Sequence, residues 1–184
     1  MALSKKMIDA LNGQVNAELY SAYLYLAMDS YFETLNLKGL AAWMNSQAKE
    51  ELFHAMRIYN FLHDRSARTV LSKIEAPKKE WKSPLNVFQE AYGHEVMVTG
   101  LINDLVDMAA KEKDHATFNF LQWYVKEQVE EEQQTDDAVK KLQLIGKDVN
   151  ALLTFDALMG ARIPIFNFPV DAPSTQAAGT ATGP

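Results

Sequence analysis

The sequence predicts an all-α fold: a four-helix bundle with one long crossover between its second and third helices, followed by a short fifth helix at the C-terminal end. Two observations predict it. Apolar residues recur at spacings of three and four along most of the chain, and the alternation typical of strands is nearly absent. Glycine and proline are scarce before the C-terminal tail, which favours long uninterrupted helices.

Capping residues mark the ends of the first two helices. Ser4 is a good N-cap residue, and the first helix runs from there to about Leu35. Residues 36–39 predict a tight connection. A second helix then extends from about Leu40 to Asp64.

The segment 65–82 is the long connection, because it has no sustained helical period and contains Pro77. A helix of about 28 residues is roughly 42 Å long. The segment, extended at about 3.3 Å per residue, spans that distance. It can therefore return along the whole bundle and leave the second and third helices parallel.

The third and fourth helices have clear boundaries. Ser83 followed by Pro84 predicts an N-cap and a proline in the first turn of the third helix, which continues to about Lys113. Asp114 can cap the fourth helix, and Gly146 stands where helices commonly end.

The fifth helix is short, and a tail follows it. Asp148 can cap a helix over residues 149–160. We expect one domain, residues 1–165. We expect residues 166–184 to be a disordered tail because they are small, polar and low in complexity.

Composition and charge narrow the possible functions. The net charge of −6 at pH 7 argues against nucleic acid as a partner and suits cations. Without cysteine the chain can form no disulfide, thiolate metal site or iron–sulfur cluster. No apolar run approaches the roughly 20 residues of a membrane span, and the N-terminus lacks the apolar core of a signal peptide. We therefore expect a cytoplasmic protein that makes no membrane contact.

A glutamate interrupts the inward-facing apolar stripe of each long helix near its middle. These residues are Glu18, Glu51, Glu95 and Glu131. Ionised carboxylates cannot share a dry core unpaired, because each loses its hydration and repels the others. No lysine or arginine stands at the central stripe positions, but two divalent cations would balance about four negative charges. The alternative is that the stripes are wrongly phased and these glutamates are solvated.

Glu51 and His54 give the sharpest metal-binding signal. Their i, i+3 spacing places a carboxylate and an imidazole on one helical face, where both can hold the same ion. Hard oxygen ligands with one imidazole favour iron or manganese; zinc is possible, and magnesium or calcium fit less well. The pair alone is a weak motif, and the other three glutamates strengthen it.

A second acidic cluster consists of Glu50, Glu127 and Glu130, each one residue off the stripes. It could form a third cation site or an exit path. Runs of charge are usually solvated, so the residues alone favour an acidic surface.

The remaining candidates are aromatic or histidine side chains. Tyr25 lies two turns along the helix from the first glutamate, near enough to donate an electron or a hydrogen bond at the site. Trp123 is a weaker candidate and is expected to be a core aromatic. Three histidines fall off the stripes and are expected at the surface: His63, His94 and His115.

Four strings around these residues resemble bacterial non-haem ferritins. They are NAELYSAYLYLAM, AKEELFHA, GHE and TFNFLQWYVKEQVEEE. The resemblance covers about residues 3–165. It implies a ferritin-like protein that oxidises Fe(II) with O2 or peroxide and deposits ferric mineral inside a homo-oligomeric cage of twenty-four subunits. The fifth helix would line the four-fold channels of that cage.

The resemblance also implies a ferroxidase centre with two iron ions. The first would be held by Glu18, Glu51 and His54, and the second by Glu51, Glu95 and Glu131. Glu51 would bridge the two ions.

A third iron site is implied as well, which reverses the preference for a solvated acidic surface. It would consist of Glu50, Glu127, Glu130 and Glu131. Gln128 would lie beside the centre as a hydrogen-bonding neighbour.

Departures from related families refine this expectation. Bacterioferritins hold haem through a methionine directly after the bridging glutamate; Leu52 stands here, so we expect no haem. They also repeat Glu-x-x-His on the fourth helix, where this chain has Gln128 and Glu131, which favours a centre that passes iron onward. The acidic positions of the three-fold channel of animal ferritins correspond to Phe118 and Leu121, so a route through the subunit wall is an alternative for iron entry.

Two other functions stay open at this point. A di-iron or di-manganese oxidase or peroxidase would keep its metals and store nothing. A bundle could also serve only as an assembly or binding module. Storage requires uptake of many more than two or three irons per subunit, and a binding module would oxidise Fe(II) no faster than buffer.

Overall fold

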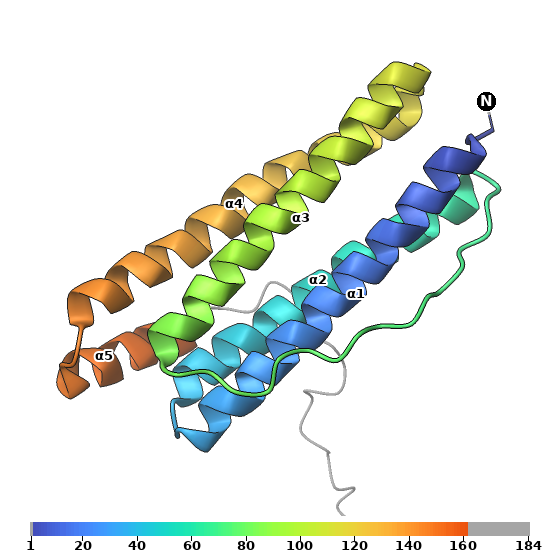
Figure 1. The fold of residues 1–184 in the computed structure, drawn as a ribbon. Coiled ribbons are helices and arrows are strands. Elements are labelled where there is room, and N and C mark those ends of the chain that lie inside the picture. The colour runs from blue at the N-terminus through green and yellow to red at the C-terminus, as the bar shows by residue number, and fades with distance from the viewer. Residues whose placement is uncertain (1, 162–184) are drawn as a thin grey trace, which may run out of the picture.

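The computed structural model describes residues 2–161 and contains five helices, with no strand among those residues. They are α1 (Lys5–Thr34), α2 (Lys38–Asp64), α3 (Pro84–Glu112), α4 (His115–Ile145) and α5 (Val149–Gly160). Figure 1 shows α1 beside α2 and α3 beside α4, with α5 across one end of the bundle. The predicted tail 166–184 and the last residues of the predicted domain, 162–165, lie outside the described residues.

The predicted N-caps form at four of the helices. The side chains of Ser4, Ser83 and Asp114 each accept a hydrogen bond from the backbone N–H three residues later, at 3.0 to 3.2 Å. Asp148 does the same for α5, accepting from two N–H groups. These bonds satisfy amides that a helix start otherwise leaves unpaired.

The start of α2 differs from the prediction, because the helix begins two residues earlier than expected, at Lys38. Leu37 makes no side-chain cap. Instead, the carboxylate of Asp156 on α5 accepts a hydrogen bond from the N–H of Leu40 at 2.8 Å. A cap supplied from 116 residues away cannot be predicted from local sequence.

The crossover 65–82 runs along the bundle beside α1 and returns the chain to the end where α2 began (Figure 1). α2 and α3 are therefore parallel, as the length of the segment predicted. Two asparagines of α1 fasten the segment: Asn12 accepts from the N–H of Val70 at 2.8 Å, and Asn16 donates to the carbonyls of Ser72 and Lys73.

The apolar core is divided into two clusters. The first, towards α5, includes Phe32, Met44 and Phe88. The second, towards the other end, includes Met7 and Ile58. Between them lies a layer of buried polar side chains, among them the predicted glutamates. The two apolar clusters close off this polar layer from both ends of the bundle.

None of the described helices is long and apolar enough to cross a membrane.

The contact between α2 and α5 depends on two glycines. A Cβ on Gly39 would lie 1.7 Å from the carbonyl oxygen of Asp156, and one on Gly160 would lie 2.8 Å from the Cα of Gly39. The two backbones therefore approach too closely for any side chain at either position.

Gly39→Ala should lower the free energy of unfolding by about 1–3 kcal/mol, because α5 must shift to admit the methyl group. Gly13→Ala is the matched control, since a Cβ there meets nothing within 4 Å. The free energy of unfolding of the control should rise by about 0.5–1 kcal/mol, because alanine has a better helix propensity than glycine. Denaturant unfolding measures both, and equal effects would contradict the account.

Candidate metal centre

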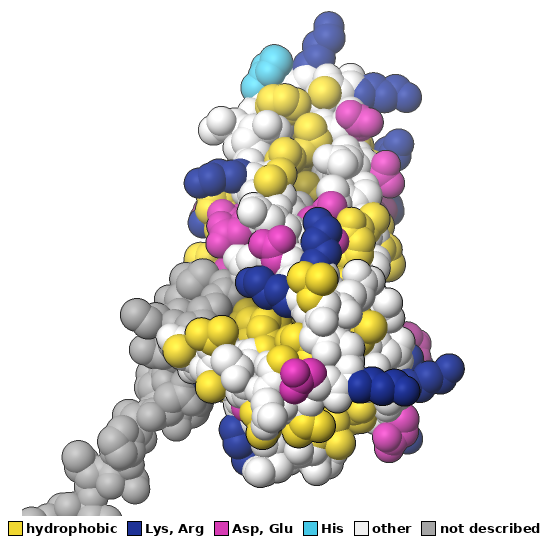
Figure 2. All heavy atoms as spheres, turned by 90° about the vertical axis from the view of Figure 1, so that its left-hand side faces the viewer, with side chains coloured by type: hydrophobic (Ala, Val, Ile, Leu, Met, Phe, Trp, Pro, Cys, Tyr) yellow, Lys and Arg dark blue, Asp and Glu magenta, His cyan; other side chains and the backbone are white. Residues whose placement is uncertain are grey.

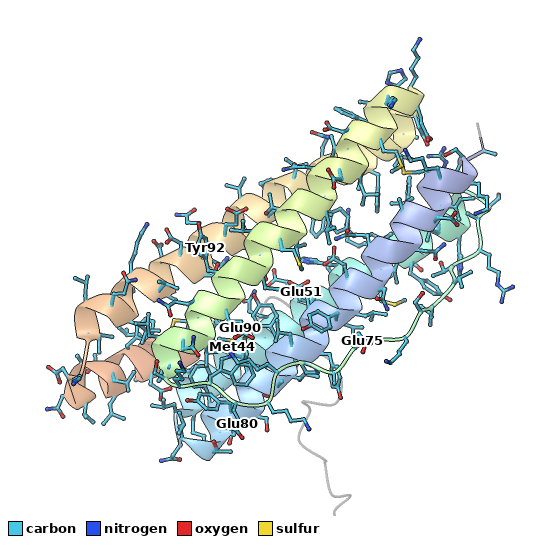
Figure 3. The ribbon with its side chains drawn as sticks, in the orientation of Figure 1. Met44, Glu51, Glu75, Glu80, Glu90 and Tyr92 are labelled. Atoms are coloured by element: carbon cyan, nitrogen blue, oxygen red, sulfur yellow. The ribbon has the colours of Figure 1, made fainter. Side chains whose placement is uncertain are left out.

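The four predicted glutamates occupy the buried polar layer, one from each long helix. Glu18, Glu51, Glu95 and Glu131 are only 1–2% exposed. Figure 3 places Glu51 in the interior, midway along the bundle. The stripes were therefore correctly phased, and the alternative of solvated glutamates is wrong. Heptad-like spacing positions these residues because each stands where an apolar side chain would otherwise fill the core.

Glu18, Glu51 and His54 are close enough to hold one metal ion. One ligand atom from each lies within 4.8 Å of the others. His54 Nδ1 is 3.5 Å from a carboxylate oxygen of Glu51. The second oxygen of Glu18, Oε2, has no hydrogen-bond partner among the described residues. A buried carboxylate oxygen without a donor fits a cation ligand.

Two glutamine amides orient the carboxylates of Glu18 and Glu131. Gln14 donates a hydrogen bond from Nε2 to Glu18 Oε1 at 3.0 Å, one turn away on α1. Gln47 on α2 donates to Glu131 Oε2 at 2.9 Å, linking α2 to α4. Such bonds fix the direction in which a ligand carboxylate points.

Glu95 accepts hydrogen bonds from both a phenol and an amide. Tyr25 donates to Glu95 Oε1 at 2.5 Å, and Gln128 donates to Glu95 Oε2 at 3.4 Å. Tyr25 and Gln128 thus both lie beside the centre, where they were predicted. The donors that reach Glu18 and Glu95 are neutral, so they orient the carboxylates without compensating their charge.

Burial makes ionisation of these carboxyl groups unfavourable. It raises the pKa of Glu51 well above 4.5, and the nearby Glu95 and Glu18 raise it further. Burial is likewise the main cause of the raised pKa of Glu18 and Glu95. The pKa of Tyr25 lies well above 10, through burial and then the adjacent carboxylates. Without a cation, the layer therefore tends to hold protons.

The second acidic cluster is placed differently from the prediction made on residues alone. Glu50 is only 5% exposed, so the expectation of a solvated side chain is wrong for it. One ligand atom each from Glu50, His54 and Glu131 lie within 4.8 Å of one another. Glu127 is half-buried and Glu130 exposed, and neither belongs to this group.

His94 was predicted at the surface and is instead 9% exposed. Its Nε2 lies 2.7 Å from the hydroxyl of Ser21, and its ring packs on Tyr20. Burial lowers its pKa to about 4. The reason is that α3 buries a face wider than a single stripe where it packs on α1. His63 and His115 are exposed, as predicted.

His54 is packed against aromatic side chains. The ring of Trp123, which is half-buried, lies edge-on with its centroid 5.3 Å from that of His54. Tyr124 donates a hydrogen bond to the carbonyl of His54 at 2.8 Å. The guanidinium of Arg57 lies 3.9 Å from the centre of the Trp123 ring. These contacts restrict the imidazole and its helix turn.

The two positions that match the three-fold channel of animal ferritins differ in exposure: Leu121 is fully buried in the second apolar cluster, whereas Phe118 is exposed. Gln14 was not predicted as a site residue at all. Its position one turn before Glu18 was the available signal, since an amide there can reach the carboxylate.

Together, this fold and this site define a class: a four-helix bundle with a buried cluster of carboxylates and a histidine that could hold a metal ion. The ferritin-like domain family matches residues 8–145. The chain belongs to the ferritin family.

The relatives agree with this assignment. The chain is 39% identical over 160 residues to the bacterial non-heme ferritins of Staphylococcus aureus (strain USA300) and Staphylococcus saprophyticus, which covers 87% of this chain and 96% of each relative. It is also similar to the solved structure of an open pore ferritin from the archaeon Archaeoglobus fulgidus. That comparison gives 54% identity and a TM-score of 0.87, covering 88% of this chain and 100% of the other.

The raised pKa of Glu51 predicts how pH acts on the metal-free protein. Between pH 4.5 and the raised pKa, the folded state holds a proton that the unfolded state has released. The contribution of Glu51 to the free energy of unfolding is therefore fully present below pH 4.5. It is lost as the pH rises through the pKa that Glu51 has in the folded state. At about pH 8, metal-free Glu51→Gln should be more stable than the parent by about 2 kcal/mol, as measured by denaturant unfolding with chelator present.

Glu75→Gln is the control, because Glu75 is exposed on the crossover (Figure 3). It should leave the pH dependence unchanged. If the parent and Glu51→Gln had the same pH dependence, Glu51 could not be the desolvated group described here.

Proposed function

We propose that this protein is an iron-storage ferritin that oxidises Fe(II) and deposits the product as ferric oxyhydroxide inside a cage. One observation carries the proposal: four glutamates and a histidine, drawn from the four long helices, share a layer closed off by apolar clusters. Divalent cations neutralise such a layer, and carboxylate oxygens with one imidazole suit iron. The relatedness to non-heme ferritins supports iron as the metal.

Iron is the substrate here, and two ions are proposed per subunit. Glu18, Glu51 and His54 would hold the first, which their mutual distances support. Glu51, Glu95 and Glu131 would hold the second, with Glu51 shared. After burial, the charge of Glu95 is the next cause of the raised pKa of Glu51, which supports their proximity.

The chemistry follows from charge. Each Fe(II) gives one electron to the oxidant, O2 or peroxide, and the resulting Fe(III) is better balanced by the anionic carboxylates. Carboxyl groups that hold protons in the metal-free state release them when iron binds. Hydrolysis of Fe(III) releases further protons, and the product leaves for the cavity.

Neighbouring residues would complete the site. Tyr25, hydrogen-bonded to Glu95, is proposed to orient that ligand and to donate an electron or a hydrogen bond during oxidation. A third iron is proposed to be held by Glu50, Glu127, Glu130 and Glu131, and the closeness of Glu50 to Glu131 supports this site. Glu127 and Glu130 are nearer the surface and would form its outer part.

Assembly into a homo-oligomeric cage of twenty-four subunits is part of the proposal. The α5 end exposes apolar side chains (Figure 2), among them Val149, Leu153 and Leu158. Exposed apolar residues of this kind are expected at subunit contacts. The similar archaeal protein is an open pore ferritin, and a closed form of it has been engineered. The proposed location is the cytoplasm.

The alternative is an oxidase or peroxidase that keeps two iron or manganese ions and stores nothing. The centre itself suits both functions. Storage is favoured because this chain matches ferritins over nearly the whole length of those relatives.

Replacing both Glu51 and His54 by alanine should abolish rapid Fe(II) oxidation and leave the rate of buffer alone. The two side chains belong to one ligand group, and Glu51 is shared with the second proposed ion. His63→Ala is the control, since His63 is exposed and away from the layer. Stopped-flow absorbance of Fe(III) formation measures all three proteins, and wild-type rates in the double variant would refute the proposal.

Iron loading separates storage from the alternative. Repeated addition of Fe(II) in air should load many more irons per subunit than two or three, within a particle of about 500 kDa, the mass of twenty-four chains of 20.7 kDa. Colorimetric iron analysis and light scattering measure both quantities. A small particle that saturates at two irons per subunit would establish the oxidase or peroxidase instead.

A further inference from the structure

A hollow of about 300 Å³ lies on the side of the bundle between α3 and α4. Its walls include the apolar side chains of Ile102, Val125 and Val129. Val129 is 67% exposed, which places it at the mouth. The hollow is large enough to admit several small molecules.

The inner end of the hollow reaches a proposed iron ligand through a single amide. Gln128 lines the hollow and is buried. Its Nε2 donates to Thr99 Oγ1 at 3.3 Å and to Glu95 Oε2 at 3.4 Å. The side chain of Gln128 thus connects the hollow to the Glu95 carboxylate.

The hollow is poorly suited to a metal ion. Among the described residues that line it, Glu132 is the one carboxylate, and it already accepts a hydrogen bond from Thr99 at 2.5 Å. Apart from Glu132, the lining groups are neutral: the polar side chains of Thr99, Asn103 and Gln128 and three aliphatic side chains. They do not replace the hydration of Fe(II). The aliphatic side chains do accept a small apolar molecule such as O2.

Two of the glutamates proposed for the third iron site lie on the other flank of α4. At 100° per residue, Val125, Val129 and Glu132 face one side of the helix, and Glu127 and Glu130 face the opposite side. The flank with Glu127 and Glu130 suits a cation, and the two valines of the other flank suit an apolar oxidant.

We propose that the hollow between α3 and α4 is the entrance for the oxidant, separate from the path of iron. This inference rests on the proposed ferroxidase function and adds to it the route of the second substrate. Gln128 acts as the gate: its amide is hydrogen-bonded to Glu95 when the hollow is empty, and its side chain moves aside when an oxidant molecule passes.

Val129→Trp fills the mouth of the hollow and tests this directly. The O2 concentration that gives half the maximal rate of Fe(II) oxidation should rise about fivefold, as expected for a modest added barrier. Anaerobic Fe(II) binding, titrated to saturation, should be unchanged. Repeating the kinetics with hydrogen peroxide shows whether both oxidants use this entrance: a parallel rise supports the route for both, and a rise with O2 alone supports it for O2.

Leu144→Trp is the matched control, because it places the same ring at another exposed aliphatic position of α4 that does not line the hollow. It should behave as wild type. Asn103→Trp, at another position lining the hollow, repeats the test if Val129→Trp fails to assemble. Cage mass is checked for every variant.

Crystals of the wild-type cage pressurised with xenon give a readout independent of turnover. Xenon, an apolar substitute for O2, should bind between Val125 and Val129. Unchanged O2 dependence in both filling variants, reduced anaerobic Fe(II) binding, or a neighbouring subunit covering the hollow would overturn the proposal. Failure of the proposed ferroxidase function is distinguishable, because wild-type protein would then oxidise Fe(II) no faster than buffer alone.

Discussion

The structure depends on one electrostatic constraint, the gathering of carboxylates in a layer from which water is largely excluded. An isolated ionised carboxylate is costly in such a place, and several together repel one another. The apolar clusters on both sides exclude solvent from the layer along the bundle axis. A bundle with this interior is less stable without cations than an apolar one would be. Such a loss of stability is typical of a functional site.

The same constraint explains the neutral donors around the centre. The carboxylates are oriented by hydrogen bonds from Gln14, Gln128 and Tyr25, none of which carries a positive charge. A lysine or arginine in their place would compensate the charge and compete with metal ions. Neutral donors keep the site rigid and leave the charge available for a cation.

Much of this could be predicted from sequence because the signals are local and repeated. Ser4, Ser83 and Asp114 cap helices through bonds within one turn, and mid-helix glutamates on apolar stripes identify the layer. Two of the errors share one cause: a single stripe underestimates the face that a bundle helix buries against two neighbours. His94 and Glu50, each next to a stripe residue, were misplaced for that reason. The start of α2 was missed because its cap comes from a distant helix.

The central claim is that metal ions occupy the buried carboxylate layer. Anomalous X-ray scattering at the iron edge, from crystals soaked anaerobically in Fe(II), tests it most directly. The account predicts two iron peaks inside each bundle, one within reach of Glu18, Glu51 and His54 and the other close by on the Glu95 side. Iron found only at surface carboxylates, with the layer left free of metal, would contradict it.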